Sequence, residues 1–260
     1  MPQSDTGENK GSVAVQYFLD TVETIPEGVG WSLFSGYHFL WLGILVVFAA
    51  VMSIQYRKRD AEKRAKWRKA VAIAILLDEV WKMFWLTVGG RYIADYLPLH
   101  LCSINIILIA IHAWKPSKTL DNFLYAICIP GAVAAMLFST WTPLPTLNFM
   151  HLHSFTIHIL LITYPVMVTV GGDIRPDWRQ LPKSLLFTLC LAVPVYCVNL
   201  ALDTNFMFLM YAEEGNPLLI FEQLFGNHLL GIPVLGAVFI GVMYGVLYIC
   251  RKLAAKKEKV

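Results

Sequence analysis

Charged residues are scarce in this sequence. Asp, Glu, Lys and Arg make up 15% of the 260 residues, whereas hydrophobic residues make up 57%. A soluble domain carries about 25% charged and roughly 45–50% apolar residues. The shortage of charge therefore excludes an ordinary soluble domain and predicts an integral membrane protein. We expect no nucleic-acid partner.

Paired cysteines are also missing. The five cysteines all lie in or at the edge of apolar runs, and no two of them form a Cys-x-x-Cys pair. This pattern argues against a thiolate zinc site, a redox pair or an outer disulfide framework. The first 36 residues are polar or amphipathic, so we expect no N-terminal signal peptide. An internal repeat is not apparent either.

Seven apolar runs of about 18–22 residues are present, and each is long enough to cross a bilayer. They fall at 37–56, 70–89, 97–114, 120–141, 149–170, 184–202 and 229–250. The sequence therefore predicts an all-α polytopic membrane protein with seven transmembrane helices. The membrane domain would span 37–250, between an extracytoplasmic segment 1–36 and a basic tail 251–260.

The basic residues predict an orientation. Eighteen of the 21 Lys and Arg residues lie on one side: eight in 57–69, two in 115–118, three in 175–183 and five after residue 250. The other side has only Lys10 and Arg91. Because Lys and Arg collect in cytoplasmic loops, we predict an outer N-terminus and a cytoplasmic C-terminus, in the cell membrane.

Two outer segments are predicted to lie on the membrane rather than cross it. Residues 12–25 put apolar side chains near one helical face, which favours a short interfacial helix. The loop 203–228 has no Lys or Arg and holds "NFMFLMY" and "NPLLIFEQLF". Asn216 followed by Pro217 predicts a helix start there. We expect this loop to rest among the headgroups and cover a site.

Polar side chains inside the runs gather in the predicted outer halves. Such residues are costly in hydrocarbon and usually face the bundle interior or a wet cavity. The sequence therefore predicts one polar pocket that opens toward the outer face. Its candidate residues are His38, Asp78, Glu79, Lys82, His100, Cys102, Asn105, His151, His153, His158, Asn199, Asp203 and Asn205.

A cysteine and a histidine are the candidates for chemistry. Cys102 sits among polar neighbours near a helix N-terminus, which favours a thiolate, although an inert buried thiol is the simpler interpretation. His158 lies at a comparable depth, and a Cys–His pair oriented by an amide or carboxylate is a workable nucleophile. The candidate orienting groups are Asn199, Asn205 and Glu79.

Simpler interpretations exist for the other polar residues. Glu79 and Lys82 are three residues apart and predict a buried structural ion pair. His100 follows a Pro-Leu step and is placed to tie a helix start to a loop. His151 and His158 are two turns apart, about 10 Å, too far to share a zinc ion that binds nitrogen at about 2.0–2.1 Å. We predict no metal and no cofactor.

Several of these stretches together resemble a known family. The stretches are "FSGYHF" (34–39), "LPLHLCSI" (97–104), "FTIHILLI" (155–162), "NLALDTNFMFL" (199–209) and "GNP" (215–217). Across roughly residues 34 to 250 the chain resembles the YwaF-like bacterial membrane proteins and their relatives, the transmembrane protein 164 acyltransferases. "LPLHLC" and the stretch after Asp203 are the specific parts of the resemblance.

The resemblance implies acyl transfer between a phospholipid and a lysophospholipid through an acyl-cysteine. Cys102 would be the nucleophile and His158 the base. The remaining site residues would be His38, Glu79, Lys82, His100, Asn105, Asn199 and Asn205. Asp203 and His153 depart from the residues that are usual in bacterial relatives, and either departure would alter the choice of substrate.

Rival functions remain open on the sequence. A membrane lipid hydrolase, with or without histidine-bound zinc, would use similar residues. An ion-coupled transporter would use Asp78, Glu79, Lys82 and the histidines, but the polar groups stop short of the inner face, whereas a carrier needs access to both sides. A retinal-type photoreceptor is disfavoured because 229–250 contains no lysine.

Overall fold

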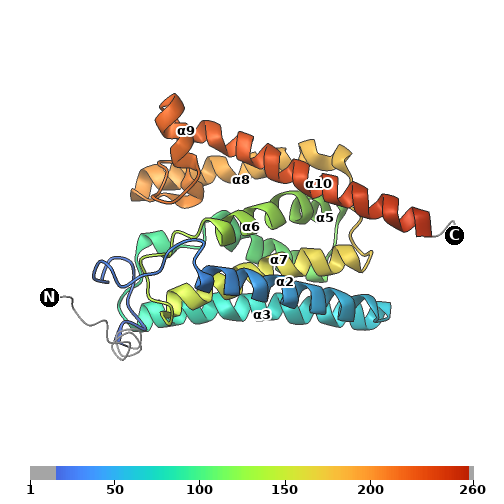
Figure 1. Cartoon of the computed structure of the whole chain (residues 1–260), viewed down its shortest axis with the longest axis horizontal. Coiled ribbons are helices and arrows are strands. Elements are labelled where there is room, and N and C mark those ends of the chain that lie inside the picture. Colours follow the sequence, from blue (N-terminus) through green and yellow to red (C-terminus); the bar gives the residue numbers. More distant parts are fainter. Residues whose placement is uncertain (1–15, 258–260) are drawn as a thin grey trace.

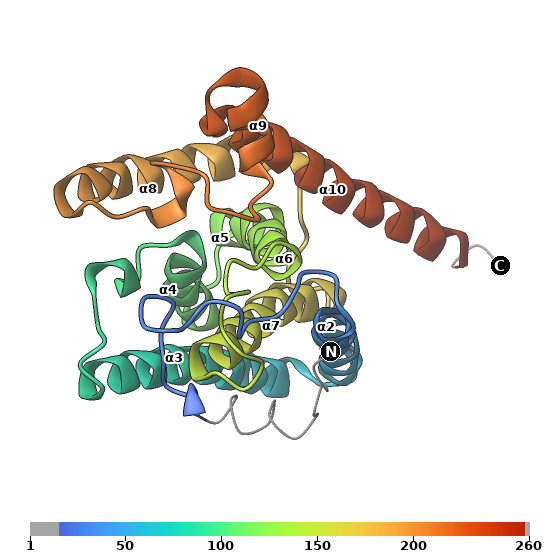
Figure 2. The same cartoon turned by 60° about the vertical axis from the view of Figure 1, so that its left-hand side comes forward.

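The computed structural model describes residues 16–257, and within that range all regular structure is helical. Figures 1 and 2 show a bundle of long helices. Six stretches are long and apolar enough to cross a membrane, judged by length and composition: Gly36–Arg57, Ala94–Trp114, Lys118–Leu137, Phe149–Val170, Trp178–Leu202 and His228–Leu253. Each of the six overlaps one of the predicted spans.

The seventh predicted span, 70–89, belongs to the longer helix α3 (Ala61–Val88). It falls outside the set of six, and its apolar half carries Asp78, Glu79 and Lys82. α3 begins earlier than predicted because the Asp60 side chain caps it, accepting from the Lys63 amide at 2.9 Å. Part of the basic stretch 57–69 is therefore helical, and a membrane crossing by α3 stays a prediction.

α7 (Phe149–Val170) is the central helix of the bundle. It packs against α2 (Gly36–Arg57), α3, α4 (Leu101–Trp114) and α6 (Ile129–Leu137), and most of its residues are buried. The helix starts at a cap in which Asn148 Oδ1 accepts from the amides of Met150 and His151. Most polar residues of α7, with the exposed Thr156 as an exception, therefore face neighbouring helices rather than lipid.

α8 (Leu181–Leu202) and α10 (Gly231–Lys257) lie at the edge of the bundle, together with the short helix α9 (Leu218–Phe225) (Figure 1). Only 11% and 6% of their membrane-length windows are buried, so their apolar side chains are available to lipid. η3 (Trp178–Gln180) precedes α8 and η5 (His228–Leu230) precedes α10. α10 continues through much of the predicted basic tail.

The fourth predicted span, 120–141, is not one regular helix. It consists of α5 (Lys118–Phe123), a π-helical stretch η2 (Leu124–Cys128) and α6, which ends at Leu137. Pro130 has no N–H to donate to the carbonyl four residues before it. The wider π-turn lies just ahead of this interruption, and every residue in η2 is buried.

The predicted interfacial helix 12–25 differs from the structure. Residues 12–15 lie outside the described range, and residues 17–25 form turns. Their carbonyls bond to the start of α7: Asn148 Nδ2 donates to the carbonyls of Tyr17 and Asp20, and the Phe149 amide donates to Phe18. These tertiary bonds take acceptors that a helix would use internally.

Other connections between the long helices include short helical turns. η1 (Ala94–Tyr96) precedes α4, which begins at Leu101 rather than at 97. η4 (Phe206–Phe208) follows α8. The predicted helix start at Asn216 and Pro217 is confirmed, because α9 begins at Leu218 and the Leu218 amide donates to Asn216 Oδ1 at 3.0 Å.

Candidate functional site

Cys102 occupies the first turn of α4 and is partly buried. His100 holds the N-cap position, but its side chain makes no capping hydrogen bond. Instead, its Nδ1 accepts from the Met207 amide at 3.3 Å. The first amides of α4 are therefore not capped by a side chain at this position, and an uncapped helix start attracts negative charge.

The segment that reaches His100 is the η4 loop, defined here as residues 203–211. Asn199 holds its first half: Asn199 Oδ1 accepts from Thr204 Oγ1 and the Phe206 amide, and Nδ2 donates to the Phe206 carbonyl at 3.0 Å. Asn205 holds its second half: Asn205 Oδ1 accepts from the amides of Met210 and Tyr211, and Nδ2 donates to the Tyr211 carbonyl. Both amide side chains are thus engaged in shaping the loop.

The rings of Phe206 and Phe208 pack against His100, with centroids 5.2 and 6.0 Å away. The η4 loop therefore packs against the start of α4, and its cover over a site stays a prediction. His100 ties that helix start to the loop.

His158 in α7 has one free ring nitrogen. Its Nδ1 lies 2.6 Å from the Ser154 carbonyl, and a carbonyl can only accept, so Nδ1 carries the ring proton. Nε2 is then an unprotonated acceptor, and it is buried without a hydrogen-bond partner. A lone pair in this state is available to take a proton.

Lys82 is the buried cation beside the candidate groups in the fold. Its ammonium lies 2.6 Å from Glu79 Oε1. The helix that carries Lys82, α3, packs against α4 and α7, which carry Cys102 and His158. The fold therefore brings the helices of all three residues together. Within residues 16–257 no hydrogen bond joins Cys102 to His158.

The ion pair belongs to a larger set that we call the charge network: Asp78, Glu79, Lys82 and His153. His153 lies between two carboxylates, with Nδ1 3.2 Å from Asp78 Oδ2 and Nε2 3.6 Å from Glu79 Oε2. The contact to Asp78 has the distance of an ion pair but not the geometry of a hydrogen bond. The sequence placed His153 in the candidate pocket but did not assign it these partners.

His38 and His151 belong to a different cluster between α2 and α7. The Phe34 amide donates to His38 Nδ1, and His38 Nε2 donates to the Met136 carbonyl at 2.7 Å. Trp31 Nε1 donates to His151 Nδ1 at 3.1 Å. His151 Nε2 lies 3.0 Å from the Tyr37 hydroxyl. Both rings are fully buried and both use each of their nitrogens in structural contacts.

Asn105 lies one turn below Cys102 in α4 and is 1% exposed. Its Oδ1 is buried and has no hydrogen-bond partner. Asn105 and His158 thus provide two unpaired acceptors in the interior of the bundle. Such atoms are costly to bury, so each marks a place where a water molecule or a substrate group would be stabilised.

Within the described range, hollows lie away from this pair. A cavity of about 130 Å³ lies at the C-terminal end of α3, and an open groove of about 700 Å³ lies along α3 and includes Asp78 and Leu160. Cys102 and His158 line neither of them. Among the described residues, no three His, Cys, Asp or Glu side chains are grouped closely enough to hold a metal ion.

Long apolar helices with ionisable side chains turned inward define a helical membrane protein. The model of the TMEM164 family matches residues 33–244, and the chain belongs to this family. The match confirms the resemblance drawn from the sequence and includes every predicted site residue from His38 to Asn205. No curated protein and no solved structure matches the chain.

Proposed function

We propose that this protein is a lipid acyltransferase that moves a fatty acyl chain from a phospholipid to a lysophospholipid through a thioester on Cys102. Family membership supports the class of reaction. One structural observation supports the assignment of residues: Nε2 of His158 is buried without a hydrogen-bond partner, on a helix that packs against α4, which carries Cys102.

In the first half-reaction, His158 Nε2 takes the proton of Cys102 and the thiolate attacks the ester carbonyl of a phospholipid. The ester C–O bond breaks, and the acyl group stays on sulfur. The departing lysophospholipid oxygen takes the proton back from His158. The uncapped amides of α4 and the Lys82 ammonium stabilise the oxyanion.

In the second half-reaction, the hydroxyl of another lysophospholipid gives its proton to His158 and attacks the thioester. The C–S bond breaks, a new phospholipid leaves, and Cys102 recovers its proton. No cofactor takes part in either half. Asn199 and Asn205 act by shaping the η4 loop, because their amide groups are already bonded to it. His38 supports the fold at a distance from these steps.

The proposal includes a topology. Seven helices, α3 among them, cross the cell membrane with the N-terminus outside. The basic residues that flank α2, α3, α8 and α10 would then lie in the cytoplasm. The start of α4 would face the outer leaflet, where phospholipids reach Cys102 without acyl-CoA.

The decisive experiment is mass spectrometry of the purified protein after incubation with phospholipid vesicles. We expect a hydroxylamine-labile acyl adduct on Cys102 that is absent in Cys102→Ala and retained in the control Cys197→Ala, an exposed cysteine of α8. Lipid turnover that survives Cys102→Ala would refute the assignment. Release of free fatty acid instead of a new phospholipid would make the same thioester part of a hydrolase.

A further inference from the structure

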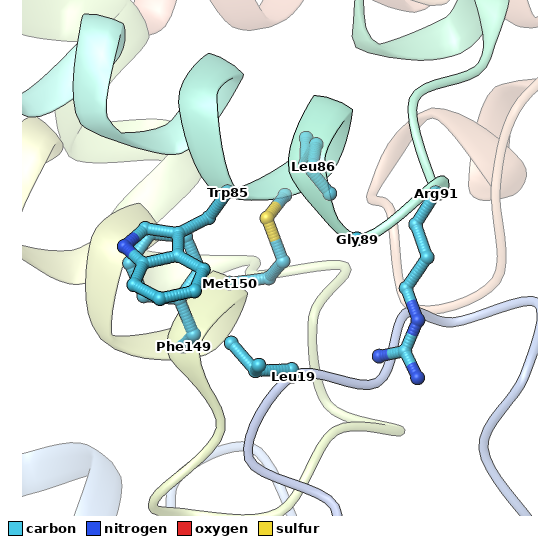
Figure 3. A pocket seen from close by; sticks show the side chains of 7 residues that line it. All are labelled: Leu19, Trp85, Leu86, Gly89, Arg91, Phe149 and Met150. Atoms are coloured by element: carbon cyan, nitrogen blue, oxygen red, sulfur yellow. The ribbon is translucent and has the colours of Figure 1, made fainter.

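A small cavity lies where the outer end of α3, the start of α7 and the N-terminal segment meet (Figure 3). Its volume is about 130 Å³, and its walls include Leu19, Trp85, Leu86, Phe149 and Met150. An engineered cavity of about 150 Å³ with similar apolar walls binds benzene. The space is therefore large enough for several methylene groups.

Arg91 is the one charged residue in the described part of the chain that lines this cavity. The chain turns sharply after α3, with Gly90 at φ +64°, and the Arg91 amide donates to the Leu86 carbonyl at 2.8 Å. This turn is a helix C-cap that requires a left-handed residue, which glycine supplies. The backbone thus fixes Arg91 at the rim, opposite Trp85 and Phe149 (Figure 3).

The guanidinium of Arg91 is only partly satisfied. One nitrogen, Nη2, pairs with Asp20 Oδ1 at 2.7 Å. The other, Nη1, is buried without a hydrogen-bond partner. A buried donor on a charged group is unfavourable when unpaired, and guanidinium groups bind phosphate oxygens well. The cavity therefore combines apolar walls with an unused donor for an anionic oxygen.

We propose that this cavity binds a phospholipid of the outer leaflet, with a phosphate oxygen on Arg91 Nη1 and adjacent methylene groups between Trp85, Phe149 and Met150. Asp20 balances the charge of Arg91, so the site suits a zwitterionic headgroup better than a further negative charge. The inference rests on the outward orientation proposed above but not on acyl transfer, because neither Cys102 nor His158 lines the cavity.

Native mass spectrometry of the full chain in detergent tests this site. Dipalmitoylphosphatidylcholine is the probe, and dipalmitoylglycerol, which lacks the phosphate, is the comparison lipid. We expect phosphatidylcholine to be retained at least tenfold better than dipalmitoylglycerol. Arg91→Gln is expected to remove this preference, whereas the control Arg179→Gln, which changes an arginine at the opposite end of the bundle, leaves it intact.

Met150→Trp provides a second variant, since it fills the cavity while keeping the Arg91–Asp20 ion pair. We expect it to reduce retention as strongly as Arg91→Gln. Cys102→Ala is expected to retain the lipid fully, so failure of the proposed chemistry and failure of this site give different results. Equal binding of the two lipids, unchanged retention in both cavity variants, or displacement by inorganic phosphate alone would overturn the proposal.

Discussion

Two histidines two turns apart on α7 illustrate how differently the bundle treats the same side chain. His151 uses both ring nitrogens, one with Trp31 and one with Tyr37. His158 uses one, with the Ser154 carbonyl, and keeps the other free. Both are buried. Burial and depth therefore do not distinguish the two histidines, and the unused lone pair of His158 is the difference on which its proposed role as a base rests.

The largest expected effect comes from changing these two residues in parallel. His158→Gln removes the proposed base, and loss of general-base catalysis typically costs about 10²–10⁴-fold in rate. His151→Gln should leave the rate per folded molecule within a few fold of wild type. Transfer of a labelled acyl chain between lipids in vesicles measures both. Equal losses in the two variants would remove the distinction.

Lys82 gives a second test of the proposed Cys102–His158 pair, through the reactivity of the Cys102 thiol. Lys82→Met removes the buried cation of the helix that packs against α4, and a nearby cation favours a thiolate, so we expect alkylation of Cys102 by iodoacetamide at pH 7.5 to slow by roughly tenfold. His153→Gln should have a smaller effect in the same direction, because His153 acts on Lys82 only through Glu79. Alkylation at the wild-type rate in Lys82→Met would show that the cation does not act on the thiol.

His38 resembles His151 in using both ring nitrogens for structural contacts, so changing it tests whether such a histidine affects stability alone. His38→Ala leaves the Phe34 amide and the Met136 carbonyl without their partners, and an unpaired buried group costs about 1–3 kcal/mol. We expect a Tm several degrees lower, with the rate per folded molecule unchanged. Thermal unfolding followed by circular dichroism measures the shift. A loss of rate at unchanged Tm would instead place His38 in the reaction.

The smallest effect concerns Glu213, beyond the η4 loop. Burial raises the pKa of Glu213 above its usual 4.5, while the polar side chains of Asn205 and Thr140 partly oppose this. A carboxyl whose pKa is raised by folding destabilises the folded state once the pH is above its unfolded pKa. Glu213→Gln should therefore raise the Tm slightly at pH 7, with no gain at pH 3.5. A constant difference across this range would contradict the assignment.

The sequence predicted the helices well because length and hydropathy are local properties. It also placed Cys102 at a helix start and His100 against a loop, since both follow from position along the chain. It did not predict that the side-chain amides of Asn199 and Asn205 form hydrogen bonds with the backbone of the η4 loop. Nor did it predict that His153 contacts two carboxylates of α3. Those partners depend on how helices pack against each other.

The turns in residues 17–25 show the same limit. The apolar spacing there is typical of a helix, yet Asn148 and Phe149, more than a hundred residues later, bond to the carbonyls of that segment. A periodic pattern indicates which side chains share a face of a helix. It does not indicate whether a backbone carbonyl accepts a hydrogen bond from a residue far away in the sequence.

The backbone of the η4 loop has a consequence for entry to the site. Met207 and Phe208 both adopt left-handed conformations, with φ of 59° and 54°, which residues other than glycine seldom occupy. His100 below and His228 beyond the loop hold them there. When the loop lifts from α4, both residues are free to relax, and this relaxation offsets part of the cost of breaking those contacts. The η4 loop would therefore open from the start of α4 at a lower free-energy cost than its hydrogen bonds alone would require.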